Sequence, residues 1–321
     1  METILAYLLL AAGFYLLLKG ADLLVKGASS LAKLINVPEI VIGLTIVAFG
    51  TSMPEFIVNV FSSIGGHSEI VFGNIIGSNI FNVLLILGVA GLIYPISMGK
   101  DGLWPDFLFS LAAPLLFFVL ANDSLFFGRA ENILSRLDGI LLLALFLLFM
   151  HYTVRLAKSA KKQNMDGISS YTMPATIFYI VIGLGALIYG GKLVVDSSVL
   201  IVRSLGVSEK LIALTIIAGG TSLPELATSA VAACKKRFAI ALGNIIGSNV
   251  FNILFILGIS AIIRPAAYAA ILNIDTYIMA CSIILLFGIF FMHKAQKLNR
   301  AEAFLLLLGY AAYLYYLIGR G

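Results

Sequence analysis

The sequence predicts an all-α integral membrane protein with ten transmembrane helices arranged as two inverted five-helix repeats. Three observations lead to this fold: the composition, a pair of segments repeated 170 residues apart, and an odd number of apolar segments in each half. Of 321 residues, 61% are hydrophobic and 12% are charged, whereas soluble domains carry roughly 25% charged residues. The 21 basic and 16 acidic side chains are too few to cover a large soluble core.

Ten segments are long and apolar enough to cross a bilayer, for which a helix needs about 20 residues. In the first half they are 3–28, 38–64, 69–93, 104–121 and 137–157, and in the second half 173–198, 208–233, 239–263, 274–292 and 302–319. We therefore divide the chain into a first five-helix repeat (1–157), a short polar cytoplasmic linker (158–172) and a second five-helix repeat (173–321). The duplicated segments cover about 38–93 and 208–263.

The duplication is visible in two blocks. G-L-T-I-V-A-F-G-T-S-M-P-E (43–55) matches A-L-T-I-I-A-G-G-T-S-L-P-E (213–225) at 9 of 13 positions. I-V-F-G-N-I-I-G-S-N-I-F-N-V-L-L-I-L-G (70–88) matches I-A-L-G-N-I-I-G-S-N-V-F-N-I-L-F-I-L-G (240–258) at 14 of 19. A repeat of this length indicates a duplicated half-protein.

The parity of the spans sets the topology. Five spans per half bring the second half into the membrane from the opposite side, which gives the inverted repeats common in secondary transporters. The loops after the odd-numbered spans hold thirteen Lys and Arg residues, against six on the other side. Because basic loops stay in the cytoplasm, we expect a multi-pass protein of the cell membrane with both termini outside the cytoplasm.

Each repeat places one glutamate, Glu55 or Glu225, near the middle of an apolar span. A carboxylate at the bilayer centre costs about 2.5–3.5 kcal/mol even on insertion scales, and such a residue is a functional hypothesis by default. No basic residue lies within a dozen positions of either glutamate, except the loop at 235–237. A bound cation is the best compensation for two such carboxylates.

The neighbouring residues offer further oxygen ligands. Proline and glycine in the G-T-S-x-P-E segments should break the helix, leave carbonyls near Ala48 and Ala218 facing a cavity, and place hydroxyls beside the glutamates. In the second block a serine and an asparagine lie four residues apart on one helix face. Oxygen ligands with no nearby His or Cys indicate calcium, magnesium or an alkali cation. The polar candidates are Thr51, Ser52, Ser78, Asn82, Thr221, Ser222, Ser248 and Asn252. The G-x-x-x-G spacings at 73–77 and 243–247 should allow close helix approach.

Other functions find little support. The chain has no nucleophile–base constellation, phosphate loop or metal–histidine cluster, so we expect neither an enzyme nor a cofactor. The basic residues lie in short loops, where membrane topology explains them, so we expect no nucleic-acid partner. The lipid bilayer and the transported ions are the expected partners, and no protein partner is evident.

With these paired motifs the chain resembles the sodium/calcium exchanger branch of the cation/calcium exchanger superfamily, in its short prokaryotic form. The resemblance covers essentially the whole chain. It implies ten helices in two inverted halves, with ions bound midway across the membrane between spans 2, 3, 7 and 8. Carried onto this sequence, it implies a ligand set of Ala48, Thr51, Ser52, Glu55, Ser78, Asn82, Ala218, Thr221, Ser222, Glu225, Ser248 and Asn252.

The resemblance further implies antiport of sodium and calcium by alternating access at one midplane site, with spans 1 and 6 as a sliding gate. Some family members carry an aspartate where this chain has Asn252. Potassium co-transport is associated with an acidic residue in this wall, so the asparagine makes it a less favoured alternative. The proton/calcium branch has a carboxylate after its G-N motif, where this chain continues I-I-G-S-N, so proton coupling is also less favoured. A channel or facilitator built on the same oxygen cage is the alternative from another class.

Overall fold

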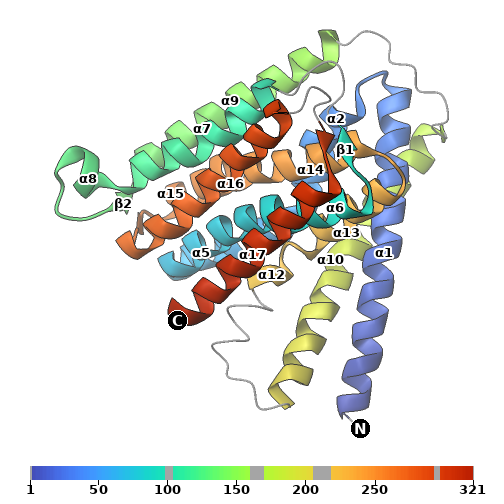
Figure 1. Ribbon diagram of the computed structural model, residues 1–321, viewed down its shortest axis with the longest axis horizontal. Coiled ribbons are helices and arrows are strands. Elements are labelled where there is room, and N and C mark those ends of the chain that lie inside the picture. Colours follow the sequence, from blue (N-terminus) through green and yellow to red (C-terminus); the bar gives the residue numbers. More distant parts are fainter. Residues whose placement is uncertain (1, 98–103, 160–169, 205–217, 293–296, 321) are drawn as a thin grey trace.

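A computed structural model describes the chain except for residues 1, 98–103, 160–169, 205–217, 293–296 and 321. Apart from four two-residue strands, its regular elements are helices. The helices lie in a slanted bundle, from which two long helices project side by side (Figure 1).

The elements up to the predicted linker are α1 (Glu2–Leu34), α2 (Glu39–Ile42), η1 (Gly43–Val47), α3 (Ala48–Thr51), α4 (Met53–Gly65), α5 (Ser68–Ile80), η2 (Phe81–Ile86), α6 (Leu87–Ile93), β1 (Ile96–Ser97), α7 (Trp104–Ala121), α8 (Asp123–Phe127), β2 (Ile133–Leu134) and α9 (Arg136–Ser159). Here η1 and η2 are π-helical and continue into the α-helices that flank them.

After the linker follow α10 (Met173–Ser204), α12 (Ala218–Gly220), α13 (Leu223–Cys234), α14 (Phe238–Val250), η4 (Phe251–Ile256), α15 (Leu257–Ile263), β3 (Ala266–Ala267), η5 (Ala270–Leu272), α16 (Asn273–Met292), β4 (Lys297–Leu298) and α17 (Arg300–Arg320). The segment η4 is π-helical and occupies the place that η2 has in the first half.

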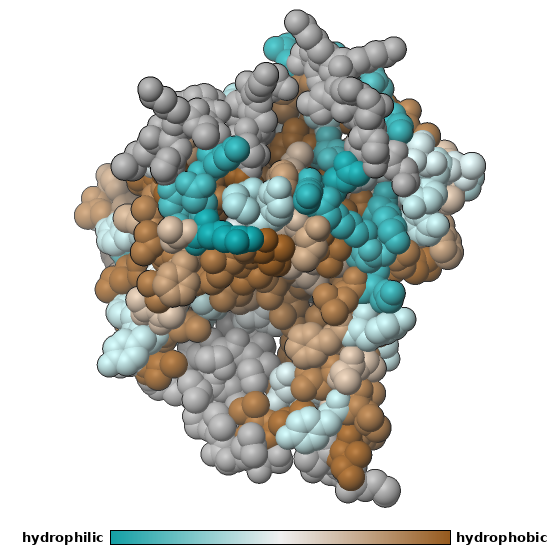
Figure 2. Space-filling view, turned by 45° about the vertical axis from the view of Figure 1, so that its right-hand side comes forward, coloured by the Kyte–Doolittle hydropathy of each residue, from teal (hydrophilic) through white to brown (hydrophobic). Residues whose placement is uncertain are grey.

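Seven helices within the described residues are long and apolar enough to cross a membrane, and the bent pair Glu39–Thr51 and Met53–Gly65 would add an eighth. Two shorter apolar helices, Pro105–Ala121 and Leu223–Cys234, coincide with further predicted spans. The span predicted over 208–233 begins outside the described residues, so the count of ten stays a prediction. Figure 2 shows a broad hydrophobic zone across one face, with the most hydrophilic residues gathered above it.

Helix α1 runs to Leu34 and is longer than the span predicted to end at residue 28. Its last turns carry charge that is paired. Lys26 lies 2.8 Å from Asp22, and Lys235, between α13 and α14, forms a second ion pair with Asp22. These paired charges lie within the predicted span, and the helix continues beyond it to a last turn that carries Lys33.

Helices α1 and α10 approach so closely that their main chains nearly touch. A methyl group at Gly20 would lie 2.8 Å from the Gly183 carbonyl oxygen, and one at Gly190 would lie 2.9 Å from the Gly13 carbonyl oxygen. The glycines on each helix are seven residues apart and therefore share one face. Small residues of this kind let membrane helices pack by close backbone contact.

We expect Gly183→Ala to lower the melting temperature of the detergent-solubilised protein. The added methyl group would lie 2.7 Å from the Leu24 nitrogen, and overpacking of this kind costs about 1–3 kcal/mol. Gly185→Ala on the same helix is the matched control, because no described atom lies within 4 Å of its methyl position. That variant should gain up to about 1 kcal/mol of helix propensity. Equal melting temperatures for the two variants would contradict this packing.

Two antiparallel strand pairs join the parts of the chain on either side of the linker. β1 pairs with β4, with Ile96 opposite Leu298, and β2 pairs with β3, with Ile133 opposite Ala267. Between them, the largest hydrophobic cluster fills the space around α5, α14 and their π-helical continuations. The elements that carry the predicted ligands therefore lie at the centre of the bundle.

Candidate cation site

The predicted break in the G-T-S-x-P-E segment lies at Ser52. The helices on either side of Ser52 meet at 48°. Ser52 has φ −84° and ψ 9°, and Ser222 has nearly the same values, −88° and 9°. The prolines at 54 and 224 lack the N–H that would continue the helix, but they fit the first turn of the helix that follows. Both copies of the sequence therefore fold into the same break.

The two breaks carry serines that reach across to the opposite repeat. Ser52 Oγ donates to Glu225 Oε1 at 2.8 Å, and Ser222 Oγ donates to Glu55 Oε1 at 2.8 Å. Each serine hydroxyl also lies near a serine of the opposite repeat, Ser248 at 3.0 Å from Ser52 and Ser78 at 3.1 Å from Ser222. The two glutamates are thereby brought into one connected site.

The threonines beside these serines also make crossed hydrogen bonds. Thr51 Oγ1 donates to Asn244 Oδ1 at 3.0 Å, and Thr221 Oγ1 donates to Asn74 Oδ1 at 3.3 Å. In turn, Asn74 Nδ2 donates to the Glu55 carbonyl at 3.3 Å, and Asn244 Nδ2 donates toward the Glu225 carbonyl at 3.5 Å. Since the threonine protons are used in this way, the hydroxyl lone pairs are available to a cation.

Asn82 and Asn252 lie in the π-helical segments η2 and η4. A π-helical turn inside an α-helix is rare and often marks a functional site. The side-chain amide of Asn82 donates to Asn249 Oδ1 at 3.0 Å, and that of Asn252 donates to Asn79 Oδ1 at 2.9 Å. The oxygen of each amide is thereby left as the group that can face a ligand.

Four acceptor oxygens of the site are buried without a hydrogen-bond donor: Glu55 Oε2, Glu225 Oε2, Asn82 Oδ1 and Asn252 Oδ1. All four side chains are 1% exposed. The ion pairs found among the described residues involve neither glutamate. Buried polar groups are normally satisfied, so these four oxygens are candidates for contact with a cation.

The types of ligand atom indicate which cation the site suits. The described residues hold no group of three or more His, Cys, Asp or Glu side chains that could bind a metal. The site offers carboxylate, hydroxyl and amide oxygens instead, which suit calcium, magnesium and alkali ions better than zinc or copper. The two carboxylates give the site a formal charge of −2 when both are ionised, enough to neutralise one divalent ion.

The model of the sodium/calcium exchanger protein family matches residues 5–155 and 175–319. The chain belongs to this family. It is 38% identical over 299 residues to the putative antiporter CaxA of Alkalimonas amylolytica, covering 90% of this chain and 91% of that one. It is 35% identical over 323 residues to the sodium/calcium exchanger MaX1 of Methanosarcina acetivorans, covering 89% and 90%.

A solved structure of the sodium–calcium exchanger NCX_Mj has the same fold as this family member. The TM-score is 0.83 at 31% identity, and the match covers 97% of this chain and 98% of that one. The predicted family is thus confirmed, and the relatives are ion exchangers rather than enzymes. In this family the ions are transported cargo and not cofactors.

Hydrogen bonds join six of the twelve predicted ligands in two crossed groups: Glu225 with Ser52 and Ser248, and Glu55 with Ser222 and Ser78. Asn82 and Asn252 are buried and bond to the opposite repeat at Asn249 and Asn79. Thr51 and Thr221 join them through Asn244 and Asn74. Thr51 is fully buried, whereas Thr221 is half-buried. Their role as ion ligands stays a prediction.

The carbonyl of Ala48 differs from the expectation that the break frees it. It accepts the Ser52 N–H at 3.0 Å, and the Thr51 hydroxyl oxygen lies 3.3 Å from it. The reason is the position of the proline: Pro54 removes the N–H that would reach Gly50, and the partner of Ala48 is intact. Ala218 begins α12, and its side chain lies outside the described part.

The expected close approach at the two G-x-x-x-G segments is found in the second copy. A methyl group at Gly247 would lie 2.6 Å from the Leu44 carbonyl oxygen, and one at Gly243 would lie 2.7 Å from the Ile40 carbonyl oxygen. At Gly73 and Gly77 no described atom lies within 4 Å of the methyl position. In the first copy the equivalent of Leu44 is residue 214, which lies outside the described residues.

Proposed function

We propose that this family member exchanges sodium for calcium across the cell membrane, by alternating access at one site between Glu55 and Glu225. The four buried acceptor oxygens without donors carry this proposal. They combine two carboxylates with two amide oxygens, a set that suits a hard cation. The names of the sodium–calcium exchangers NCX_Mj and MaX1 support the choice of ions.

The charge of the site explains why such a protein would exchange ions rather than leak them. Without a cation, two carboxylates remain in a low-dielectric interior, which is costly. Movement of the empty site across the membrane is therefore disfavoured, while one calcium ion or more than one sodium ion lowers that cost. The α1–α10 pair, held by close glycine contacts, is our candidate for the element that slides between the two states.

Calcium flux into proteoliposomes tests the proposal. Vesicles loaded with sodium, potassium or acid buffer, one at a time, should take up calcium from the medium when sodium is inside and not otherwise. Uptake driven by potassium or protons instead would assign the chain to one of the alternative couplings. Uptake that needs no counter-ion on the other side would indicate a channel, and it would overturn antiport.

The inverted layout with ten spans is part of the same proposal. The crossed hydrogen bonds support it, because each bond of one repeat has a counterpart 170 residues away: Ser52–Glu225 matches Ser222–Glu55, and Thr51–Asn244 matches Thr221–Asn74. A two-fold relation between the halves would produce such pairs. With the basic loops in the cytoplasm, both termini would lie outside.

Cysteine labelling in intact cells should confirm the orientation. Cys234 is exposed at the end of α13, and His67 is exposed in the equivalent loop of the first repeat. A membrane-impermeant maleimide should label His67→Cys, placed in a chain with Cys234→Ala and Cys281→Ala. It should not label Cys234 in a Cys281→Ala chain until the membrane is permeabilised. The reverse pattern would place the termini in the cytoplasm.

A further inference from the structure

Two asparagine pairs cross between the repeats. Asn82 Nδ2 donates to Asn249 Oδ1 at 3.0 Å, and Asn252 Nδ2 donates to Asn79 Oδ1 at 2.9 Å. None of the four side chains is more than 1% exposed. Asn82 and Asn252 belong to the predicted ligand set, whereas Asn249 and Asn79, which accept their hydrogen bonds, do not.

The direction of an amide matters at a cation site. An asparagine carries an oxygen and an NH2 group of similar size on the same carbon. Its oxygen attracts a cation, and its NH2 group repels one, so an amide that turns over becomes an opposing group. Here the NH2 groups of Asn82 and Asn252 are used in the crossed bonds, and the oxygens are the atoms left without a partner.

Reversal of either ligand amide would be costly in this arrangement. If the Asn252 amide turned over, its oxygen would face Asn79 Oδ1. Two hydrogen-bond acceptors would then face each other without a proton between them. Asn79 is itself held, since its Nδ2 donates to the Asn249 main-chain oxygen at 3.4 Å and lies 3.6 Å from the Met279 sulfur. Asn79 therefore presents its oxygen, and not its NH2 group, to Asn252.

We propose that Asn79 and Asn249 are positioning residues, which hold the amide oxygens of Asn252 and Asn82 toward the transported cation. This inference rests on the proposed function of the site. It adds two residues that act on the ion through their partners. A purely structural role, in which the pairs only join the two repeats, is the competing explanation.

Thermal unfolding separates these explanations, because an ion that binds the folded protein raises its melting temperature. We would measure the purified full chain with and without calcium chloride. Asn79→Ala and Asn249→Ala should each raise the calcium concentration for half-maximal stabilisation at least about tenfold, a loss of about 1.4 kcal/mol in binding. Half-saturation of calcium uptake in proteoliposomes should shift in the same direction.

Asn122→Ala provides the matched control. Asn122 is also buried and also accepts a hydrogen bond from another asparagine, Asn273, at 2.9 Å. It lies at the end of α7 and makes none of the contacts described for the cation site. Its replacement should lower the melting temperature without calcium and leave the half-maximal calcium concentration unchanged.

A double-mutant cycle tests whether Asn79 acts through Asn252. When Asn252→Ala has already removed the amide, Asn79→Ala should weaken calcium binding no further. The pair Asn82→Ala and Asn249→Ala gives an independent version of the same test, should Asn79→Ala fail to fold. Additive losses in calcium binding, or calcium binding in both single variants equal to that of the unmodified protein, would overturn the inference.

The failure of this inference can be told apart from failure of the proposed function. If the unmodified protein binds calcium and carries out sodium-driven uptake while both asparagine variants bind normally, only the positioning role is wrong. If the unmodified protein shows neither calcium-dependent stabilisation nor uptake, the site does not bind calcium and both proposals fail.

Discussion

Replacement of Glu55 by glutamine is expected to abolish sodium-driven calcium uptake, and Glu225→Gln should have the same effect. Glutamine keeps the shape of the side chain and can still accept the serine hydroxyl that Glu55 accepts from Ser222 at 2.8 Å. It removes one of the two carboxylates and can turn an NH2 group toward the ion. Loss of one partner of a buried charge interaction costs about 2–5 kcal/mol, so uptake should fall at least about thirtyfold.

Stability without ions should move in the opposite direction. Both glutamates are buried, with one oxygen each that lacks a donor. Removing a buried, uncompensated charge lowers the cost of folding. We therefore expect the Glu55→Gln protein to melt at or above the temperature of the unmodified protein in the absence of calcium and sodium. The rise in melting temperature on adding calcium should disappear.

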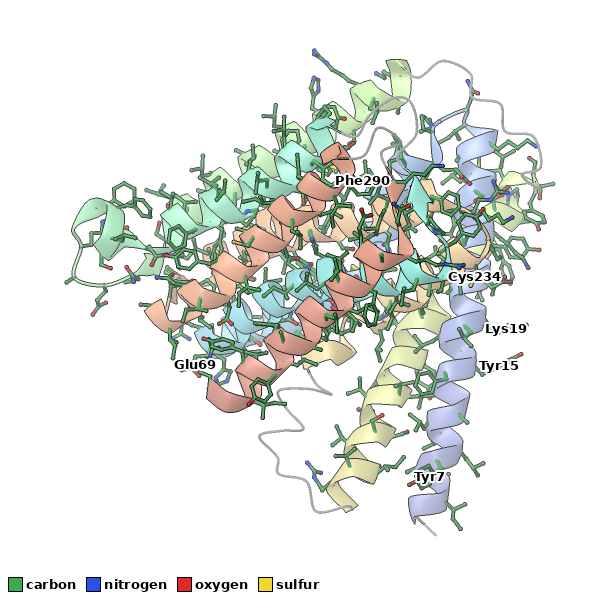
Figure 3. All side chains as sticks on the ribbon, viewed as in Figure 1. Tyr7, Tyr15, Lys19, Glu69, Cys234 and Phe290 are labelled. Atoms are coloured by element: carbon green, nitrogen blue, oxygen red, sulfur yellow. The ribbon has the colours of Figure 1, made fainter. Side chains whose placement is uncertain are left out.

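Glu69→Gln is the control for these variants. Glu69 is exposed in the first turn of α5, at the end of the bundle (Figure 3). Its replacement removes the same charge and should leave calcium uptake close to normal. If both Glu55→Gln and Glu225→Gln retained normal uptake, the cation would not be held by these carboxylates, and the proposed site would be wrong.

The crossed hydrogen bonds give the site a property that neither repeat has alone. Each glutamate oxygen that accepts a hydrogen bond is held by a serine from the other repeat, at 2.8 Å in both cases. The unpartnered oxygens are therefore oriented by both halves together. A relative movement of the halves would change the distances between these oxygens, which links ion binding to conformation. This coupling is part of our proposal for alternating access.

Much of the site could be predicted from the sequence, because its signals are local. The break at Ser52 follows from proline and glycine in one segment, and the structure confirms the bend. The choice of Glu55 and Glu225 follows from the cost of a carboxylate in an apolar span. The serine and asparagine positions follow from helical spacing. Each of these inferences needs only neighbouring residues and the register of the duplication.

The remaining features depend on which helix faces which, and periodicity does not contain that information. The hydrogen bonds of Thr221 to Asn74 and of Asn252 to Asn79 join residues 147 and 173 positions apart. The π-helical turns at Asn82 and Asn252 have no signal in residue propensity, although their presence in both copies shows that the local sequence favours them. The ion pair of Asp22 with Lys235 likewise joins residues that are far apart along the chain.

The Asn252→Asp variant should keep measurable exchange but make it depend on pH in a way that the unmodified protein does not. The substitution adds a third carboxylate beside two buried ones. In the unmodified protein the Asn252 NH2 group donates to Asn79 Oδ1 at 2.9 Å. An ionised aspartate would face that oxygen without a proton to donate, whereas a protonated one can donate as asparagine does.

The direction of the pH effect follows from these two states. As the pH falls, the added carboxyl takes up a proton, the fixed charge of the site returns to that of the unmodified protein, and exchange should approach normal values. As the pH rises, the ionised carboxylate should hold calcium more tightly and release it more slowly, and the maximal rate should fall about tenfold for each 1.4 kcal/mol of added stabilisation of the bound state. Calcium uptake and half-saturation measured across a pH series would show both trends.

Asn82→Asp provides a second test of how an added carboxyl affects exchange, because Asn82 makes the equivalent hydrogen bond to Asn249 at 3.0 Å. We expect the same sign of pH dependence in both variants. An Asn252→Asp protein with normal half-saturation for calcium and no new pH dependence would mean that this side chain does not touch the ion. The fixed charge that governs exchange would then come from Glu55 and Glu225 without any contribution from the asparagine wall. In that case substitutions at Asn252 could not be used to change ion coupling.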